Sequence, residues 1–321
     1  MKLRNHLRRI RASAACVALL LAPSIEARDA SRAVLYYLNY SGKVMRVDVD
    51  GSHKRELVGQ LGMGPDGIAV DSAARHLYWT NMGGARHDDG TITRANFDGT
   101  AVRTLVSAGG TFTPKQLKLD LRHGKMYWSD REGMRVMRAD LDGSHIETLV
   151  TTAEGDAARV DQRNWCVGIA LDVDKGHVYW SQKGGDNAGH GRILRTNLQM
   201  RPGEDSRHRS DIEVLFDQLP EPIDLDLDLR AGFIYWTDRG DNTVSRAPMN
   251  KPMGMDPAKR TDRQILVRGL REAIGISLDL RGKRMFYTSL GGELGVADLD
   301  GGHAKLLLTD EGALTGIAFV E

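Results

Sequence analysis

A short aromatic phrase recurs along the chain and limits the possible fold more than any other feature. Four full copies combine Tyr, Trp and a hydroxyl residue, and two weaker copies flank them. The full copies are residues 77–80, 126–129, 178–181 and 234–237, and the weaker ones are residues 35–38 and 285–288. Consecutive copies are separated by roughly 40 to 55 residues, the length of four-stranded propeller blades rather than of helical repeats.

Further features keep register with this phrase. An Ile- or Val-led run ending in Arg follows the aromatic residues in most repeats, and Asp-Gly pairs typical of hairpin turns come next. An aspartate precedes the aromatic pair in five repeats: Asp71, Asp120, Asp172, Asp228 and Asp279. We interpret these recurring residues as scaffold rather than as a catalytic set. Each aspartate is expected to accept backbone N–H bonds or to pair with an arginine of the neighbouring blade.

The two ends of the chain indicate how the repeats close. Residues 316–319, Gly-Ile-Ala-Phe, copy the first strand of a repeat but stand at the C-terminus, whereas the first repeat begins at its Tyr-Tyr strand. Joining the two gives a sixth complete sheet and removes the open sheet edges. The sequence therefore predicts an all-β fold over residues 28–321, a six-bladed β-propeller closed by pairing the C-terminal strand with the N-terminal blade.

These motifs resemble the YWTD, or LDL-receptor class B, repeat family, and the resemblance covers essentially the whole chain after residue 27. It implies a propeller that binds protein or peptide ligands across one face. The chain departs from the family pattern in places. Asp130 and Asp238 keep the fourth-position aspartate, but Asn81 and Gln182 replace it elsewhere, and Val296 replaces the repeat arginine of the last blade.

Residues 1–27 have the three-part pattern of a secretory signal peptide. A basic start is followed by an apolar run at residues 14–22 and by the small residues Ser24 and Ala27. The apolar run is about half of the ~20 residues that a membrane-spanning helix needs. We therefore expect cleavage near Ala27, a secreted or periplasmic protein, and no membrane span in the mature chain.

Charge and cysteine content narrow the function classes. Residues 1–27 hold five cations and one anion, so their removal takes the net charge from +1 to −3. A nucleic-acid partner is not expected, because its binding needs a basic excess. Cys166 is then the only cysteine, so no intramolecular disulfide can form. We expect a monomer stabilised by its apolar core.

One run of carboxylates leaves a metal site open. Asp224, Asp226 and Asp228 alternate along a predicted strand, so their side chains share one face. Three carboxylates near the channel could hold calcium, which prefers oxygen ligands. The alternative is that Lys118, at the matching position two blades earlier, or ordered water satisfies them. We favour this alternative and expect no cofactor.

Long loops on one face are the candidate ligand site. Two Gly-rich insertions and the connection at residues 151–164 share the face where second strands lead into third strands. Between the insertions lies a short charged turn, and Trp165 stands outside the aromatic phrase, close to the same mouth. The candidate ligand-binding residues are His87, Asp88, Asp89, Arg131, Glu132, Trp165, Asp186, Asn187 and His190.

Two further expectations concern these loops. His87, Asp89 and His190 could form a metal site, although their spacing is not a known ligand motif. The insertions at residues 200–210 and 250–262 are expected to be solvated loops on the opposite face. Arg207 is therefore expected to lie far from the ligand.

Our main hypothesis is an exported, non-catalytic binding protein whose protein or small-molecule ligand sits over the channel mouth. The sequence lacks the Gly-x-Ser-x-Gly, His-Glu-x-x-His, Cys-x-x-Cys and phosphate-loop motifs. The alternative is a calcium-dependent lactonase or related hydrolase with its metal near the channel centre. Other six-bladed propellers that this architecture resembles act in that way, and only the aspartate triplet favours it here.

Overall fold

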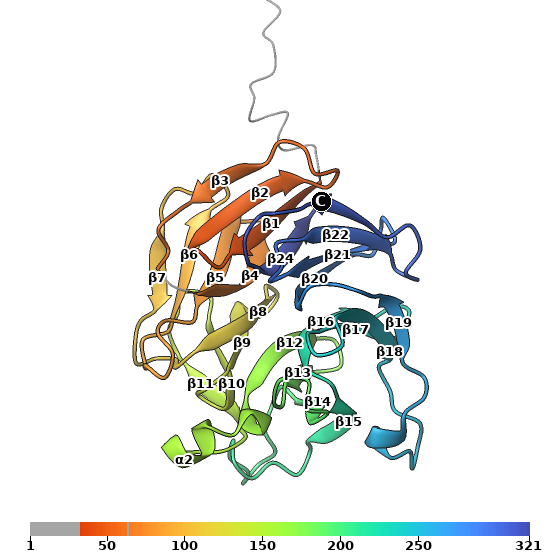
Figure 1. Ribbon diagram of the computed structural model, residues 1–321. Coiled ribbons are helices and arrows are strands. Elements are labelled where there is room, and N and C mark those ends of the chain that lie inside the picture. Colours follow the sequence, from red (N-terminus) through yellow and green to blue (C-terminus); the bar gives the residue numbers. More distant parts are fainter. Residues whose placement is uncertain (1–32, 63) are drawn as a thin grey trace, which may run out of the picture. The chain divides into compact units, whose positions relative to one another are not determined.

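The computed structural model describes residues 33–62 and 64–321, which form six four-stranded antiparallel sheets (Figure 1). From the innermost strand outward, blade 1 is β24 (Leu314–Val320), β1 (Val34–Asn39), β2 (Lys43–Asp48) and β3 (Arg55–Val58). Blade 2 is β4 (Pro65–Asp71), β5 (His76–Asn81), β6 (Thr91–Asn96) and β7 (Arg103–Val106). Blade 3 is β8 (Pro114–Asp120), β9 (Lys125–Asp130), β10 (Arg135–Asp140) and β11 (Glu147–Thr151).

The other three blades repeat this order. Blade 4 is β12 (Cys166–Asp172), β13 (His177–Gln182), β14 (Gly191–Asn197) and β15 (Glu213–Leu219). Blade 5 is β16 (Pro222–Asp228), β17 (Phe233–Asp238), β18 (Thr243–Pro248) and β19 (Gln264–Val267). Blade 6 is β20 (Ala273–Asp279), β21 (Arg284–Ser289), β22 (Leu294–Asp298) and β23 (Lys305–Leu308). Each innermost strand packs on the innermost strands of both neighbouring blades, so the six surround a central channel.

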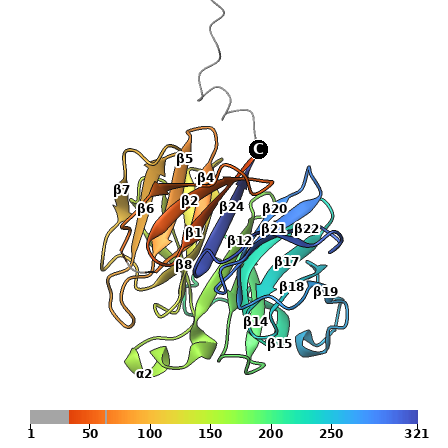
Figure 2. The same ribbon diagram turned by 45° about the horizontal axis from the view of Figure 1, so that its top comes forward.

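The predicted ring closure is confirmed. β24, the C-terminal strand, pairs antiparallel with β1, and Leu35 lies opposite Phe319 (Figure 2). The C-terminus thus supplies the innermost strand that the first repeat lacks. β24 also packs against β20 and β4 on its two sides, which leaves no gap between blades 6, 1 and 2.

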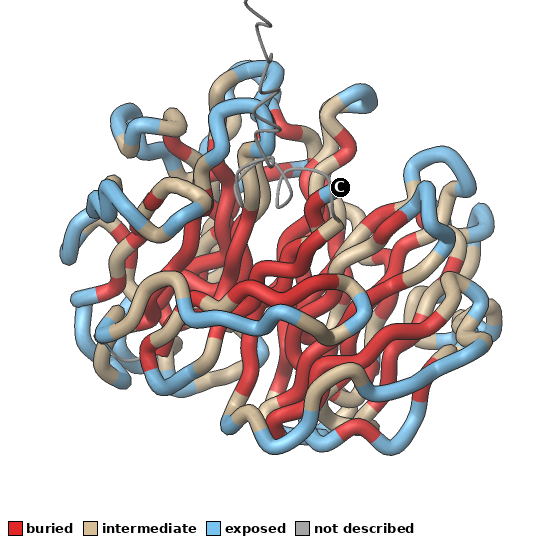
Figure 3. The backbone as a smooth tube through the Cα atoms, turned by 90° about the horizontal axis from the view of Figure 1, so that it is seen from above, coloured by how far each residue is buried: buried red, intermediate tan, exposed pale blue. Residues whose placement is uncertain are grey.

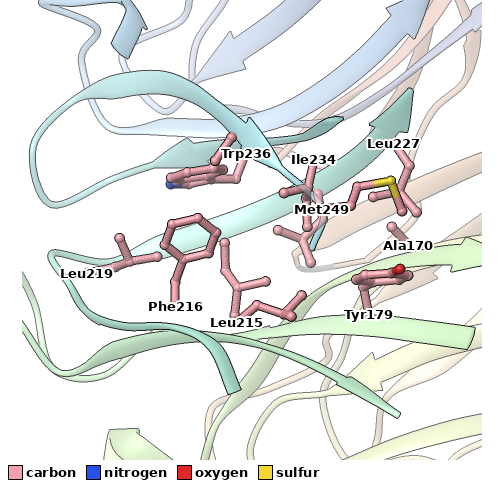
Figure 4. Close-up of a cluster of buried hydrophobic side chains, with 12 residues drawn as sticks. Ala170, Tyr179, Leu215, Phe216, Leu219, Leu227, Ile234, Trp236 and Met249 are labelled. Atoms are coloured by element: carbon pink, nitrogen blue, oxygen red, sulfur yellow. The ribbon is translucent and has the colours of Figure 1, made fainter. Parts of the chain in front are cut away.

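The aromatic phrase fills the space between blades. Trp79, Trp128, Trp180 and Trp236 are fully buried. Between blades 4 and 5, Trp236 lies against Phe216 with ring centroids 5.1 Å apart, beside Leu215 and Leu219 (Figure 4). Buried residues run along the strands, whereas exposed residues gather in the turns (Figure 3). The sheets therefore bury their faces against each other, as the repeat predicts.

Each strand-end aspartate caps its own turn. Asp71, Asp228 and Asp279 accept hydrogen bonds of 2.7–2.9 Å from backbone N–H groups three residues later. The repeat arginines act between blades instead: Arg246 donates to the backbone oxygen of Leu299, 2.8 Å away in blade 6. Of the two expected roles, the aspartates therefore accept backbone N–H bonds rather than pair with an arginine of the neighbouring blade.

The insertions at residues 200–210 and 250–262 are mostly exposed, as predicted, but each is anchored to the preceding blade by one arginine. Arg209 has a fully buried side chain, pairs with Asp211 at 2.8 Å, and donates to the oxygen of Leu149 in blade 3. Arg260 pairs with Asp262 and donates to Leu215 in blade 4 in the same way. Both insertions therefore fold back over the preceding blade, held by an Arg-x-Asp clamp.

The expected position of Arg207 is wrong. Its guanidinium lies 2.7 Å from Glu154, in the connection between blades 3 and 4. The backbone N–H of Thr151 donates to the oxygen of Ser206, so the insertion follows the outer edge of β11 up toward that connection. This covers part of an edge that would otherwise carry unpaired backbone groups.

The predicted signal peptide, residues 1–27, lies outside the described residues. Among residues 33–62 and 64–321, none of the helices is long and apolar enough to cross a membrane.

Candidate functional site

One end of the channel is built by the loops between second and third strands. The first residue of each loop donates its backbone N–H to the connection that precedes the same blade, as Arg131 does to Thr113 and Arg239 to Glu221. The bond is repeated in all six blades. It fixes these loops and connections on one face and aims the first loop residue at the channel axis. The six first residues are Tyr40, Met82, Arg131, Lys183, Arg239 and Leu290.

These six residues line a cavity of about 430 Å³, here called the mouth cavity. Its floor comes from the second residue of the innermost strands, among them Asp66 and Lys115. The lining is split by chemistry. Blades 6, 1 and 2 contribute Leu290, Tyr40 and Met82, whereas blades 3, 4 and 5 contribute Arg131, Lys183 and Arg239. The mouth therefore has an apolar half and a basic half.

The cations of the basic half are paired with carboxylates. Lys183 lies 2.6 Å from Glu221 and 2.9 Å from Asp186. Arg239 is held more loosely, 3.2 Å from Glu272 and 3.5 Å from both Glu221 and Asp186. Charge-assisted hydrogen bonds are usually 2.7–2.9 Å long, so the Arg239 guanidinium is available to another acceptor.

Arg131 is more firmly held. Its Nε and Nη2 donate to the two carboxylate oxygens of Glu132 at 2.7 and 2.6 Å. Burial alone would raise the pKa of Glu132, but hydrogen bonding and charge from Arg131 keep that pKa below its usual value. The pair uses Nε and Nη2, so Nη1 of Arg131, a residue that lines the mouth cavity, is a further donor.

The floor of the mouth cavity holds a buried ion pair. Lys115 Nζ lies 2.5 Å from Asp66, whose other oxygen accepts from Gln116. Burial lowers the pKa of Lys115, and the nearby charges of Arg131 and Lys183 lower it further against the opposing effect of Asp66. Three cations thus converge at the channel axis.

A second cavity of about 610 Å³, here called the rim cavity, adjoins the mouth cavity and shares Arg131, Lys183 and Arg239 with it. Trp165 lies in its wall, partly buried. The Arg131 guanidinium is 4.9 Å from the centre of the Trp165 ring, a cation–π contact. The indole Nε1 donates to the oxygen of Arg159 at 2.8 Å. Arg159 ends the short helix α2 (Asp156–Arg159), which is followed by the 3₁₀ turn η1 (Gln162–Asn164).

The structure brings together part of the predicted site. Arg131, Glu132, Trp165 and Asp186 all line the rim cavity, and Asn187 lies beside them, its N–H 3.4 Å from Glu221. The other four residues lie elsewhere on this face. Asp89 closes its own loop by accepting from Gly84, beside His87, whereas Asp88 and His190 line two separate outer cavities.

Neither candidate metal site is assembled. Residues 33–62 and 64–321 contain no group of three or more His, Cys, Asp or Glu side chains placed to hold a metal ion. Asp224 and Asp226 instead accept hydrogen bonds of 3.1 Å from the backbone N–H groups of Ile276 and Leu278 in blade 6. Lys118 reaches across from blade 3 to lie 3.8 Å from Asp226, the alternative that the sequence favoured.

Buried charges also shift the pKa values in this cluster. Burial raises the pKa of Asp224 to about 7, although Lys118 and two backbone N–H groups oppose the shift. Burial would lower the pKa of Lys118, but the charges of Asp226 and Asp224 raise it on balance. The cluster therefore acts as a cross-channel tie between blades 3 and 5. Asp228 caps its turn and takes no part in it.

Comparison with known proteins gives the family. The chain is 42% identical over 292 residues to a low-density lipoprotein receptor-related protein 1 of Pyricularia oryzae, covering 87% of this chain and 92% of that protein. This chain belongs to the YWTD, or LDL-receptor class B, repeat propeller family. A human low-density lipoprotein receptor-related protein 5-like protein is 29% identical to this propeller over 204 residues, covering 63% of the chain and 69% of the relative.

A further relative extends beyond the propeller. It is a 3-hydroxyacyl-CoA dehydrogenase-like protein, LAM1, of Cochliobolus heterostrophus, 35% identical over 287 residues. The match covers 86% of this chain but only 60% of that protein. No family model matches the chain.

Solved structures share the fold at low identity. A chain of a nidogen/laminin complex superposes with a TM-score of 0.68 at 20% identity, covering 90% of this propeller and 98% of that chain. TolB of Acinetobacter baumannii gives 0.63 at 15%, covering 91% and 67%. A gluconolactonase of Xanthomonas campestris gives 0.57 at 18%, covering 90% and 85%. These likenesses show the propeller fold alone, so the calcium-dependent hydrolase stays a prediction.

Sequence reasoning missed most of the mouth. Tyr40, Met82, Lys183, Arg239 and Leu290 were not candidates, because no repeated identity marks them. A positional signal was present: each one stands two positions after the four-residue aromatic phrase. Aligning the repeats on that phrase and comparing the second residue after it would have shown the split between apolar and basic blades.

Proposed function

We propose that this YWTD propeller is an exported, non-catalytic binding protein that holds a peptide segment of its ligand over the mouth cavity. The observation that carries the proposal is the split lining. Arg131, Lys183 and Arg239 face the apolar side chains of Leu290, Tyr40 and Met82 across about 430 Å³. A segment with one acidic side chain beside one apolar side chain matches this arrangement.

The charges in the mouth support an acidic rather than a neutral group. Glu221 and Glu132 are buried behind their cations, 1% and 3% exposed. Arg239 keeps a quarter of its side chain exposed and has only long contacts with its carboxylates. A ligand carboxylate can therefore take bidentate hydrogen bonds from this guanidinium without breaking a short ion pair.

Trp165 supports a protein ligand. Its ring lies 4.9 Å from the Arg131 guanidinium and 5.8 Å from Lys183 Nζ, and part of it lines the rim cavity. Trp and Arg are the residue types most often found at the energetic centres of interfaces. The family relationship to receptor-related proteins and the signal-like pattern of residues 1–27 fit an extracellular or periplasmic setting.

A peptide-display selection tests the proposal. The purified wild-type propeller is presented to a random peptide library, and the affinities of the selected peptides are then measured for wild type and for each variant. We expect enriched peptides in which Asp or Glu lies within a few residues of a large apolar residue. Their affinity should fall about tenfold or more in Arg239→Gln and in Trp165→Ala, the usual effect of losing a buried charge partner or an aromatic anchor.

The matched control is Arg103→Gln, an exposed arginine on the outer strand β7, which should bind as wild type does. Thermal melting should be nearly unchanged in all three variants. Selected peptides that show no acidic preference, or that bind Arg239→Gln as tightly as wild type, would contradict the proposal.

A further inference from the structure

The opposite end of the channel carries a feature that the ligand site does not use. Five turns of four residues join innermost strands to second strands: residues 72–75, 121–124, 173–176, 229–232 and 280–283. Innermost strands begin at the mouth and end at these turns, so the turns surround the exit of the channel. They are called the exit turns here.

The exit turns are strongly basic. Their twenty residues hold six cations, Arg75, Arg122, Lys175, Arg230, Arg281 and Lys283, and one anion, Asp174, which gives a net charge of +5. All six cations are exposed. The strand-end aspartates that precede the turns cap backbone N–H groups, and Asp120, Asp172 and Asp279 are only 2–4% exposed. The ring of cations therefore faces solvent.

Three of these cations have carboxylate partners. Arg122 pairs with Asp174 at 2.7 Å, Lys175 lies 3.5 Å from Asp172, and Arg281 pairs with Glu321. In each pair the cation is more than half exposed, so the pairs are weak and exchange readily with other anions. The third-to-fourth-strand loops at the same end sum to −1 over residues 49–54, 97–102, 141–146, 198–212, 249–263 and 299–304. The five strand-end aspartates beside the turns bring the formal sum at the exit to zero, but three of them are buried, so the exposed charge around the exit is basic.

Large apolar side chains alternate with these cations. The tripeptide Asp-Leu-Arg occurs in three of the five turns, at residues 120–122, 228–230 and 279–281. Leu121, Leu229 and Leu280 are 46%, 41% and 44% exposed. More than two fifths of each leucine faces solvent at a turn tip, and the same side chain on blades 3, 5 and 6 suits a partner that extends across the exit.

We propose that the exit turns dock the propeller onto the surface of an anionic lipid bilayer. A bilayer surface offers both parts of the required chemistry in one plane. Lipid phosphates and carboxylates attract the six cations, and the acyl boundary below them accepts the three leucines. A sulfated polysaccharide would satisfy the cations but offers no apolar phase to the leucines. Because the mouth lies at the other end of the channel, a docked propeller would present its ligand site away from the lipid.

Vesicle sedimentation tests this proposal. The probes are phosphatidylcholine vesicles, with and without about one third phosphatidylserine, at physiological ionic strength. We expect the wild-type propeller to bind only the phosphatidylserine vesicles. Arg122→Gln, Arg230→Gln and Arg281→Gln combined should lower the partition coefficient roughly tenfold or more. Leu121→Ser, Leu229→Ser and Leu280→Ser combined should lower it similarly while leaving retention on a heparin column unchanged.

The matched control removes three exposed arginines from the mouth face, Arg86→Gln, Arg163→Gln and Arg268→Gln, and should bind vesicles as wild type does. Melting curves check that each variant is folded. Three results would overturn the proposal: no binding to phosphatidylserine vesicles, equal loss in the control, or unchanged binding of the leucine variant, which would indicate a general polyanion site. Trp165→Ala should keep vesicle binding, so failure here is distinguishable from failure of the ligand proposal.

Discussion

One hydroxyl group per blade ties the innermost strands of this YWTD propeller together. Thr80 Oγ1 accepts from the backbone N–H of Gly67 in its own blade at 2.8 Å. It donates to the backbone oxygen of Lys115 in the next blade at 2.7 Å. Ser181 and Thr237 make the same pair of bonds in blades 4 and 5. The hydroxyl residue that ends the aromatic phrase thus makes a blade-to-blade hydrogen bond, which explains why Thr or Ser recurs there.

Blade 1 solves the same problem differently. Its phrase has Leu38 at the hydroxyl position, so β1 cannot make this bond. Thr315 of β24 supplies the hydroxyl instead and donates to the oxygen of Pro65 in blade 2 at 2.8 Å. The C-terminal strand therefore contributes both the missing edge and the missing tie.

The fourth-position aspartates differ in their surroundings, and this difference predicts a pH dependence. Asp130 and Asp238 both accept backbone N–H bonds from the end of the connection that precedes their own blade, but only Asp130 also pairs with an arginine, Arg135, at 2.5 Å. Burial raises the pKa of Asp238 to about 7, and the charge of Asp241 raises it further against Arg263. The stability that Asp238 contributes is therefore fully present below about pH 4 and lost as the pH rises through about 7.

Asp238→Asn should remove this dependence. Asn already stands at the matching position in blades 1 and 2, so the amide fits. The variant should match wild type near pH 4 and exceed it at pH 8 by at most about 4 kcal/mol, since one pKa unit is about 1.4 kcal/mol. Urea unfolding at both pH values measures the difference. Asp130→Asn is the control and should be destabilised, because it breaks the pair with Arg135. A constant difference between Asp238→Asn and wild type across this range would contradict the assignment.

At the scale of elements, the insertions of blades 4 and 5 act as braces on the preceding blades. Arg209 donates to backbone oxygens of Leu149 and Asn197, and it holds the pKa of the Asp211 carboxyl well below its usual value through hydrogen bonding. The Arg260 clamp repeats the arrangement one blade later and stacks on the Phe216 ring at 3.8 Å. These braces anchor long loops whose other residues are mostly exposed.

Arg209→Met should cost about 3–5 kcal/mol of unfolding free energy, the usual cost of leaving one member of a buried pair uncompensated. The control is Arg207→Gln, two residues away, whose pair with Glu154 is more than half exposed and should cost less than about 1 kcal/mol. Adding Asp211→Leu to Arg209→Met should recover part of the loss. Equal midpoints for Arg209→Met and Arg207→Gln in urea would rule out the brace.

The sequence predicted the features that recur in every blade, but it did not predict the contacts that single residues make. Blade number, strand order and ring closure followed from the aromatic phrase, because each copy carries the same packing requirement. Trp165 was found because it breaks that pattern. Arg239 and Lys183 were missed because their role depends on where the ring places them, and the Arg209 clamp was missed because Leu149 lies sixty positions away in the chain.

At the scale of the whole molecule, closure determines every site described above. The mouth cavity takes lining residues from all six blades, including Ala313 and Thr315 at the start of β24. The exit turns likewise form a ring only if the innermost strands do. An open ring would expose the edges of β1 and its neighbours and would divide the apolar half of the mouth, which blades 6, 1 and 2 supply.

The melting temperature of a chain lacking residues 315–321 tests this account most directly. We expect the truncated protein to aggregate or to melt far below wild type, because it loses the innermost strand of blade 1 and the Thr315 tie. A synthetic peptide of residues 314–321 added in trans should restore part of the loss, whereas deletion of Glu321 alone should change little. A truncated protein that stays monomeric with an unchanged melting temperature would contradict the closed six-bladed ring.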